Sequence, residues 1–142
     1  MDFNTEGLLL LTSDGPLAHA LTHPSNAVSR VYRVKVSGRV DESWLARLRR
    51  GVDLEDGPAA AERVEVTQRL NNATWLEIEV KEGRNRLIRR LMEAGGYPVR
   101  RLVRLSYAGI ELGGLKPGQV RKLTAGEYGR LRSACGLEGE VI

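Results

Sequence analysis

Cysteine, histidine and aromatic side chains are scarce in this sequence. Among 142 residues there are one cysteine and two histidines, and aromatic residues make up 5%. The single Cys135 excludes an intramolecular disulfide and a zinc site built from several cysteines, which suits a reducing compartment. His19 and His23 have the i, i+4 spacing of a helical metal pair, but no third ligand is near them in the sequence. We therefore predict no metal site.

Long apolar runs are absent as well. The run Leu8–Leu11 has the length of a buried strand and is far shorter than the roughly 20 residues that cross a bilayer. No charged-then-apolar leader opens the sequence. From these absences and the length of 142 residues, we expect a single domain spanning 1–142, a cytoplasmic location, no membrane contact and a monomeric state.

The pattern of apolar residues and turn signals predicts an α+β fold, in which short helices flank a mixed, mostly antiparallel sheet. The clearest signals are Asp41, a good N-cap, and Gly51, a helix stop. The alternation from Trp75 to Val80 is typical of a half-buried strand. We predict strands at residues 7–12, 31–37, 61–68, 73–80, 99–108 and 120–123, and helices at residues 16–22, 41–50, 85–94 and 125–134.

Positive charge is concentrated in one stretch. The net charge of the chain is +4, whereas residues 84–104 contain seven arginines and one acid, Glu93. A local positive zone of this kind is typical of a surface that contacts a phosphate backbone. The alternative is a solvated helix face in a sequence that is rich in arginine.

Spacing separates packing residues from chemical ones in the predicted helix at 85–94. Its apolar residues share one face, and its arginines lie off that face. Arg89 can then reach a buried carboxylate while Arg86 and Arg90 face phosphates. From spacing alone, a simple salt bridge from Arg89 to Glu82 or Glu93 is equally compatible. The apolar positions are Leu87, Ile88, Leu91 and Met92.

The most specific pattern lies at the start of the sequence. Asp2 is followed by Thr5, then by Gly7-Leu8-Leu9 and Thr12-Ser13-Asp14-Gly15. This segment resembles the motif that carries the catalytic aspartate in the pseudouridine synthases that modify ribosomal RNA. In that motif the aspartate is followed three residues later by Thr or Ser, then by Gly-Leu-Leu and a Thr-x-Asp-Gly turn. Asp2 occupies the place of the aspartate.

The rest of the sequence resembles the same family in the same order. Ser29–Gly38 resembles the strand with the family's active-site tyrosine, here Tyr32. Residues 82–92 resemble its basic helix, in which Arg89 takes the place of the arginine that pairs with the aspartate. The resemblance covers nearly the whole chain and implies the pseudouridine synthase fold. The remaining matches are a turn at residues 51–59 and closing strands at 99–104 and 115–123.

The resemblance implies a definite chemistry. Enzymes of this family detach a uracil from its ribose, rotate it and rejoin it through carbon, without a metal or cofactor. Asp2 would either attack C1′ or remove a proton from C2′, and Arg89 would keep it ionised. Tyr32 would stack on the flipped uracil, and Leu102 would line the pocket. We expect ribosomal RNA as the partner, with its phosphates contacted by Arg84, Arg86, Arg90, Arg100 and Arg101.

The sequence departs from the family at its start. Related enzymes have an opening strand before the aspartate, with an arginine two residues ahead of it, whereas here Met1 directly precedes Asp2. We expect the natural gene to begin upstream and residues 1–142 to be an N-terminally truncated catalytic domain. The alternative is a non-catalytic RNA-binding domain, derived from such an enzyme, that uses residues 84–104.

Overall fold

A computed structural model of the chain describes residues 4–23 and 26–137. Its main sheet has the order β1-β7-β2-β6-β5, and β8 pairs with β7 beside this path. Only β1 and β7 run parallel; the other pairs are antiparallel, which confirms the prediction of a mixed, mostly antiparallel sheet. The strands are β1 (Glu6–Gly7), β2 (Arg30–Ser37), β5 (Arg63–Arg69), β6 (Ala73–Val80), β7 (Val99–Tyr107) and β8 (Ile110–Glu111).

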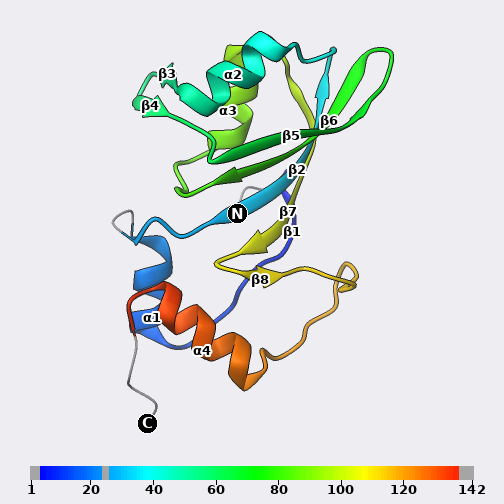
Figure 1. Ribbon diagram of the computed structural model, residues 1–142. Coiled ribbons are helices and arrows are strands. Elements are labelled where there is room, and N and C mark those ends of the chain that lie inside the picture. The colour runs from blue at the N-terminus through cyan, green and yellow to red at the C-terminus, as the bar shows by residue number, and fades with distance from the viewer. Residues whose placement is uncertain (1–3, 24–25, 138–142) are drawn as a thin grey trace.

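Within the described residues, four helices and a small hairpin complete the α+β fold. They are α1 (Gly15–Thr22), α2 (Glu42–Arg50), α3 (Leu87–Ala94) and α4 (Ala125–Ala134), with the hairpin formed by β3 (Val52–Leu54) and β4 (Gly57–Ala59). Figure 1 shows α2, α3 and the hairpin gathered at one end of the sheet, and α1 and α4 together at the other, near β8.

Each group of helices has its own hydrophobic core. The larger core joins α2 and α3 to the central strands through fully buried residues such as Leu48, Leu76 and Leu91. The smaller core joins α1, α4 and β8 through Leu17, Ile110 and Leu131. The sheet therefore carries two packed bodies, and the boundary between them can hold a cleft.

Three predicted helices are confirmed, with local causes that the sequence displays. Asp41 caps α2 by accepting a hydrogen bond from the amide of Trp44 at 2.9 Å, and Gly51 ends this helix. Asp14 caps α1 through the amide of Leu17 at 3.1 Å. Thr124 and Glu127 form a reciprocal capping box at the start of α4, which satisfies amide groups that the helix itself leaves unpaired.

The predicted strand at residues 7–12 is wrong in extent. Only Glu6 and Gly7 form β1, and the amide of Leu8 makes a last hydrogen bond to the carbonyl of Arg104 at 2.9 Å. The chain then crosses toward α1, so that Leu8 is buried but Leu9 and Leu11 are 54% and 81% exposed. A continuous apolar run shows no periodicity, so its sequence cannot distinguish a buried strand from an irregular connecting segment.

The predicted strand at residues 120–123 does not form. Val120 is 86% exposed, and Arg121 pairs with Glu127 of the α4 capping box at 2.7 Å. The segment therefore leads into α4.

The predicted helix at 85–94 begins two residues late, at Leu87, because Arg86 adopts a left-handed backbone with φ of 55°. The hairpin β3–β4 was expected only as a turn at residues 51–59.

None of the helices in the described part of the chain combines the length and apolarity that crossing a bilayer requires. Within residues 4–23 and 26–137, no three His, Cys, Asp or Glu side chains are placed to share a metal ion, and the rings of His19 and His23 lie 5.3 Å apart.

Candidate active site

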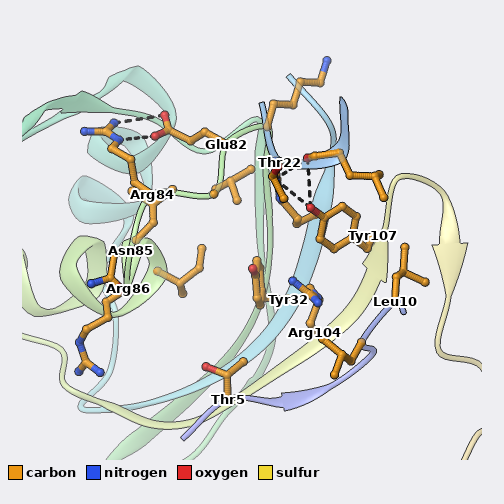
Figure 2. Close-up of a pocket in the computed structure, with 18 of the residues that line it drawn as sticks. Thr5, Leu10, Thr22, Tyr32, Glu82, Arg84, Asn85, Arg86, Arg104 and Tyr107 are labelled. Atoms are coloured by element: carbon orange, nitrogen blue, oxygen red, sulfur yellow. Dashed lines mark hydrogen bonds and ion pairs between the residues drawn. The ribbon is translucent and has the colours of Figure 1, made fainter. Parts of the chain in front are cut away.

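A cleft of about 1020 Å³ opens on one face of the sheet. Its floor is formed by β2 and β7, one wall by the segment that leads into α3, and the other by residues of the N-terminal segment and α1. Figure 2 shows Tyr32 and Arg104 at its centre, between Thr5 on one side and the pair Glu82–Arg84 on another. The cleft thus lies where the two packed bodies meet.

Tyr32 and Leu102 reach this cleft because of strand periodicity. Successive side chains of a strand point to opposite faces, so Tyr32 of β2 shares a face with Arg30, and Leu102 of β7 shares a face with Arg104. All four line the cleft. Register places Tyr32 directly opposite Arg104. The structure therefore brings Tyr32 and Leu102 together, although their proposed roles in a reaction stay predictions.

Arg89 lies behind the cleft and faces the N-terminal segment. Its side chain is buried, with 8% exposure, in contrast to the prediction that it lies off the packed face of the helix. Its Nη2 donates a hydrogen bond to the carbonyl oxygen of Asn4 at 2.8 Å. Its Nε is buried and has no hydrogen-bond partner among the described residues. Neither Glu82 nor Glu93 forms an ion pair with Arg89, so the salt bridge considered from spacing does not form.

The N-terminal segment is fastened to the cleft at several points. Thr5 lines the cleft. Gly7 pairs with Arg104 in β7, and Arg104 Nε donates to the carbonyl of Leu8 at 2.9 Å. Gly7 is required there: its φ is +105°, and an added Cβ would lie 2.3 Å from the carbonyl oxygen of Arg104. Asp2, the predicted catalytic carboxylate, lies outside the described residues.

The predicted phosphate-contacting arginines fall into separate groups. Arg84 and Arg86 line the cleft. Arg84, however, donates to Glu82 and to the carbonyls of Gly57 and Pro58, so it ties the start of α3 to the β3–β4 hairpin. Arg90 pairs with Asp56 of the same hairpin at 2.8 Å. The hydrogen bond from Arg90 is the main cause that lowers the pKa of Asp56, and the charges of Arg90 and Arg84 contribute less.

Arg100 and Arg101 also differ in position. Arg100 is exposed and lies where the pairing of β7 with β2 shifts register. Arg101 lines a second groove, of about 1290 Å³, together with Arg33 and Val103. By strand alternation this groove lies on the opposite face of the sheet from Tyr32 and Leu102. Arg101 is paired there with Glu6 at 3.0 Å, which lowers the pKa of Glu6.

Arg30, Arg104 and Tyr107 line the cleft, but no role was predicted for them from the sequence. A signal for Arg30 was present, because it occupies the same strand face as Tyr32, two positions earlier. Arg104 was counted in the basic stretch without a role of its own. Tyr107 is recognisable only from tertiary contacts, since its ring stacks with both arginines.

Comparison with known proteins shows which family the chain belongs to. A sequence model of RNA pseudouridylate synthases matches residues 1–94, which is more than half of the chain. The chain belongs to the RNA pseudouridylate synthase family. The family resemblance implied by Asp2, Tyr32 and Arg89 is thereby confirmed at the level of the family.

Individual members of this family are similar to the chain over almost its whole length. A ribosomal large subunit pseudouridine synthase B from Salmonella typhimurium is 46% identical over 142 residues, covering 99% of this chain and 49% of that protein. An uncharacterised RNA pseudouridine synthase from Mycobacterium bovis is 44% identical over 137 residues, covering 96% and 54%. The chain thus spans about half the length of these relatives.

A solved structure extends the comparison to the fold. A pseudouridylate synthase crystal structure matches with a TM-score of 0.85 and 30% identity, over 92% of this chain and 56% of that one. The pseudouridine synthase fold is therefore present here.

Proposed function

We propose that this protein converts a uridine of ribosomal RNA to pseudouridine in the cleft that holds Tyr32. The observation that carries the proposal is the bond from Arg89 to the carbonyl of Asn4, beside Thr5 in the cleft wall. Asp2 is two residues from Asn4, so covalent geometry limits the separation of their Cα atoms to about 7 Å. The family motif and the cleft are thus linked by a short chain segment.

The reaction breaks the bond between N1 of uracil and C1′ of ribose and forms a bond from C5 to the same carbon. The proton on C5 is lost and N1 gains one, so the composition of the nucleotide does not change. We assign the Asp2 carboxylate to the ribose, either as the nucleophile at C1′ or as the base at C2′. Tyr32 offers a flat face for the detached uracil while it rotates.

Arg89 is proposed to hold this carboxylate. An ionised carboxylate in a dry cleft is unstable unless a cation offsets its desolvation. The Nε of Arg89 is a buried donor without a partner among the described residues, and such groups are normally satisfied. An oxygen of Asp2 would satisfy it while Nη2 keeps its bond to Asn4.

Ribosomal RNA is the proposed substrate class because relatives from Salmonella typhimurium and Haemophilus influenzae, 46% and 45% identical, are named as large-subunit enzymes. Acting on ribosomal RNA, the protein would work in the cytoplasm, and it would need no cofactor. From the positive stretch at residues 84–104, Arg86 of the cleft and the exposed Arg100 would contact the phosphate backbone.

The test uses this chain and the longest in-frame form that its gene encodes. Each is incubated with unmodified transcripts of ribosomal RNA, and pseudouridine is quantified by chromatography of the digested nucleosides. We expect product with the wild type and none with Asp2→Asn, whose amide keeps the volume but cannot act as nucleophile or base.

Glu6→Gln is the matched control. It changes a second carboxylate of the same segment, which is 57% exposed and paired with Arg101 on the opposite face. Its activity should remain. Turnover by Asp2→Asn would reject the assignment of Asp2. RNA binding without turnover in any form of the wild-type protein would leave the binding-domain alternative in place of the enzyme.

A further inference from the structure

Three arginines are buried in the part of the chain that the structure describes. Arg30, Arg89 and Arg104 are each less than 9% exposed, and none of them pairs with a carboxylate among the described residues. More exposed arginines, such as Arg63 and Arg90, do have acidic partners. This is the reverse of the usual pattern, because buried charges are normally paired. Arg30 and Arg104 both line the cleft.

Arg104 has hydrogen-bonding capacity left over. Its Nε donates to the carbonyl of Leu8 at 2.9 Å, and its two terminal nitrogens make no hydrogen bond with the described residues. The side chain lies beside Tyr32 in the middle of the cleft (Figure 2). A guanidinium held at one nitrogen, with a free pair of donors, has the planar fork that binds two oxygens of a phosphate.

Arg30 and Tyr107 brace this guanidinium. The ring centre of Tyr107 lies 4.5 Å from the guanidinium carbon of Arg104 and 4.9 Å from that of Arg30. Arg30 is itself fixed by bonds to the carbonyl of Val28 at 2.6 Å and to the hydroxyl of Tyr107 at 3.2 Å. An added Cβ at Gly83 would lie 3.0 Å from Arg30 Nη2, so the backbone closes over Arg30 as well.

Two like charges that share one aromatic ring in a buried site repel each other, and the ring offsets this only in part because it has no net charge. An anion between or beside them removes the repulsion. The alternative is that Arg30 and Arg104 serve only to bind backbone carbonyls. That alternative accounts for Arg30, whose two terminal nitrogens both donate hydrogen bonds. It leaves the terminal nitrogens of Arg104 without a partner among the described residues, in a cleft.

We propose that Arg104, braced by Arg30 and Tyr107, binds a phosphate of the nucleotide that occupies the Tyr32 cleft. This rests on the proposed RNA substrate. Tyr32 and Arg104 are register partners on adjacent strands, where opposed Cα atoms are about 4.5–5.5 Å apart. A phosphate on Arg104 therefore belongs to the nucleotide whose base reaches Tyr32 or to its direct neighbour, and it fixes the sugar relative to the catalytic carboxylate.

The test compares ligands that differ only in a phosphate. Uridine, uridine 5′-monophosphate and uridine 3′-monophosphate compete with a fluorescent single-stranded RNA, and displacement is followed by anisotropy. We expect one of the two nucleotides to compete about 10- to 100-fold better than uridine, as a charge-assisted hydrogen-bond pair provides. Arg104→Gln should remove this preference.

Arg33→Gln is the matched control, because Arg33 follows Tyr32 in β2 but lines the groove on the opposite face. Its preference for the nucleotide should equal that of the wild type. Thermal unfolding verifies that each variant folds. If Arg104→Gln does not fold, Arg104→Lys decides: it keeps the charge but lacks the fork, so its preference should fall below that of the wild type.

A wild-type protein that does not distinguish uridine from either nucleotide would overturn the phosphate site, and so would an unchanged preference in the folded Arg104 variant. The pseudouridine assay is scored separately. A phosphate preference that depends on Arg104, without isomerisation of any RNA, would retain the phosphate site and reject the proposed function. Isomerisation without such a preference would reject the phosphate site alone.

Discussion

The Nη2 of Arg89 donates a hydrogen bond to the carbonyl oxygen of Asn4 across 2.8 Å, although 85 residues separate the two in sequence. This bond joins the buried side of α3 to the segment that carries the family motif. Two further contacts, Gly7 with Arg104 and Leu8 with Arg104, hold the same segment against β7.

Arg89→Ala should impair catalysis far more than RNA binding. The substitution removes the cation proposed for Asp2, and loss of one partner of a buried charge pair costs about 3–5 kcal/mol. Expressed in kcat/KM, this is a loss of roughly 100-fold or more. Single-turnover pseudouridine formation and the affinity for a ribosomal RNA fragment are measured in parallel.

Arg90→Ala is the control for this change. It removes an arginine from the same helix, but one that is paired with Asp56 outside the cleft. We expect little change in the rate of the bound complex and at most a moderate loss of affinity. If Arg89→Ala and Arg90→Ala weaken RNA binding equally and leave the single-turnover rate unchanged, Arg89 has no role in holding Asp2.

Gly7→Ala should detach the N-terminal segment from the sheet. Its Cβ would overlap the carbonyl oxygen of Arg104 at 2.3 Å, and its φ of +105° is unfavourable for alanine. Overpacking of this kind costs about 1–3 kcal/mol. We expect faster hydrogen exchange of the Leu8 amide, which bonds to Arg104, and a matching loss of pseudouridine formation.

Gly109→Ala is the control that distinguishes backbone strain at a positive φ from displacement of the N-terminal segment. Gly109 has a similar φ of +81°, but an added Cβ there meets no atom within 4 Å. This variant should lose about 1 kcal/mol of stability from backbone strain while Leu8 exchange and activity stay as in the wild type. Full activity in Gly7→Ala would show that the position of the N-terminal segment does not matter to the reaction.

These contacts also show why the sequence predicted part of the site only. Tyr32 and Leu102 were predicted to share a pocket through the family resemblance, and both line the cleft. The end of β1 after Gly7 could not be predicted, because a run of leucines has no hydrophobic period. The contacts with β7 that fix this end are long-range in sequence. Arg104 owes its position to contacts with the N-terminal segment, with β2 and with Tyr107 of its own strand, and no spacing along the chain predicts such a combination.

Acid should weaken the start of α4 through Glu127. The hydrogen bond from Arg121, followed by the amide of Thr124, lowers the pKa of Glu127 from 4.5 to about 2. A carboxylate whose pKa is lower in the folded than in the unfolded state stabilises the fold at pH values above its unfolded pKa of 4.5. This stabilisation is lost as the pH falls toward about 2. The difference in Tm between wild type and Glu127→Gln should therefore be constant near neutral pH and shrink in that window.

Arg121→Gln provides the check on the cause. In its background the effect of Glu127→Gln on Tm should be smaller at neutral pH, because the main contact that lowers the pKa of Glu127 is gone. Other carboxylates titrate equally in both proteins of each pair, so they cancel. A Tm difference that persists undiminished down to pH of about 2 would contradict the charge-based account of this cap.

The affinity for RNA should depend on salt through the cleft face and not through the opposite face. Each phosphate contact with single-stranded RNA contributes about −0.7 to the slope of log association constant against log salt, so three to five contacts give roughly −2 to −3.5. Arg100→Gln should flatten the slope by about one contact. Arg101→Gln should leave the slope unchanged, because Arg101 is paired with Glu6 and lines the groove on the opposite face of the sheet.

Tyr32→Ala should lower the affinity for RNA by a factor that salt does not alter, since stacking releases no counterions. Titrations with a ribosomal RNA fragment and an unrelated RNA of equal length measure all three effects. Equal affinities for both RNAs at every salt concentration, unaffected by Tyr32→Ala, would mean that the protein binds RNA through charge alone and that the cleft does not select a nucleotide.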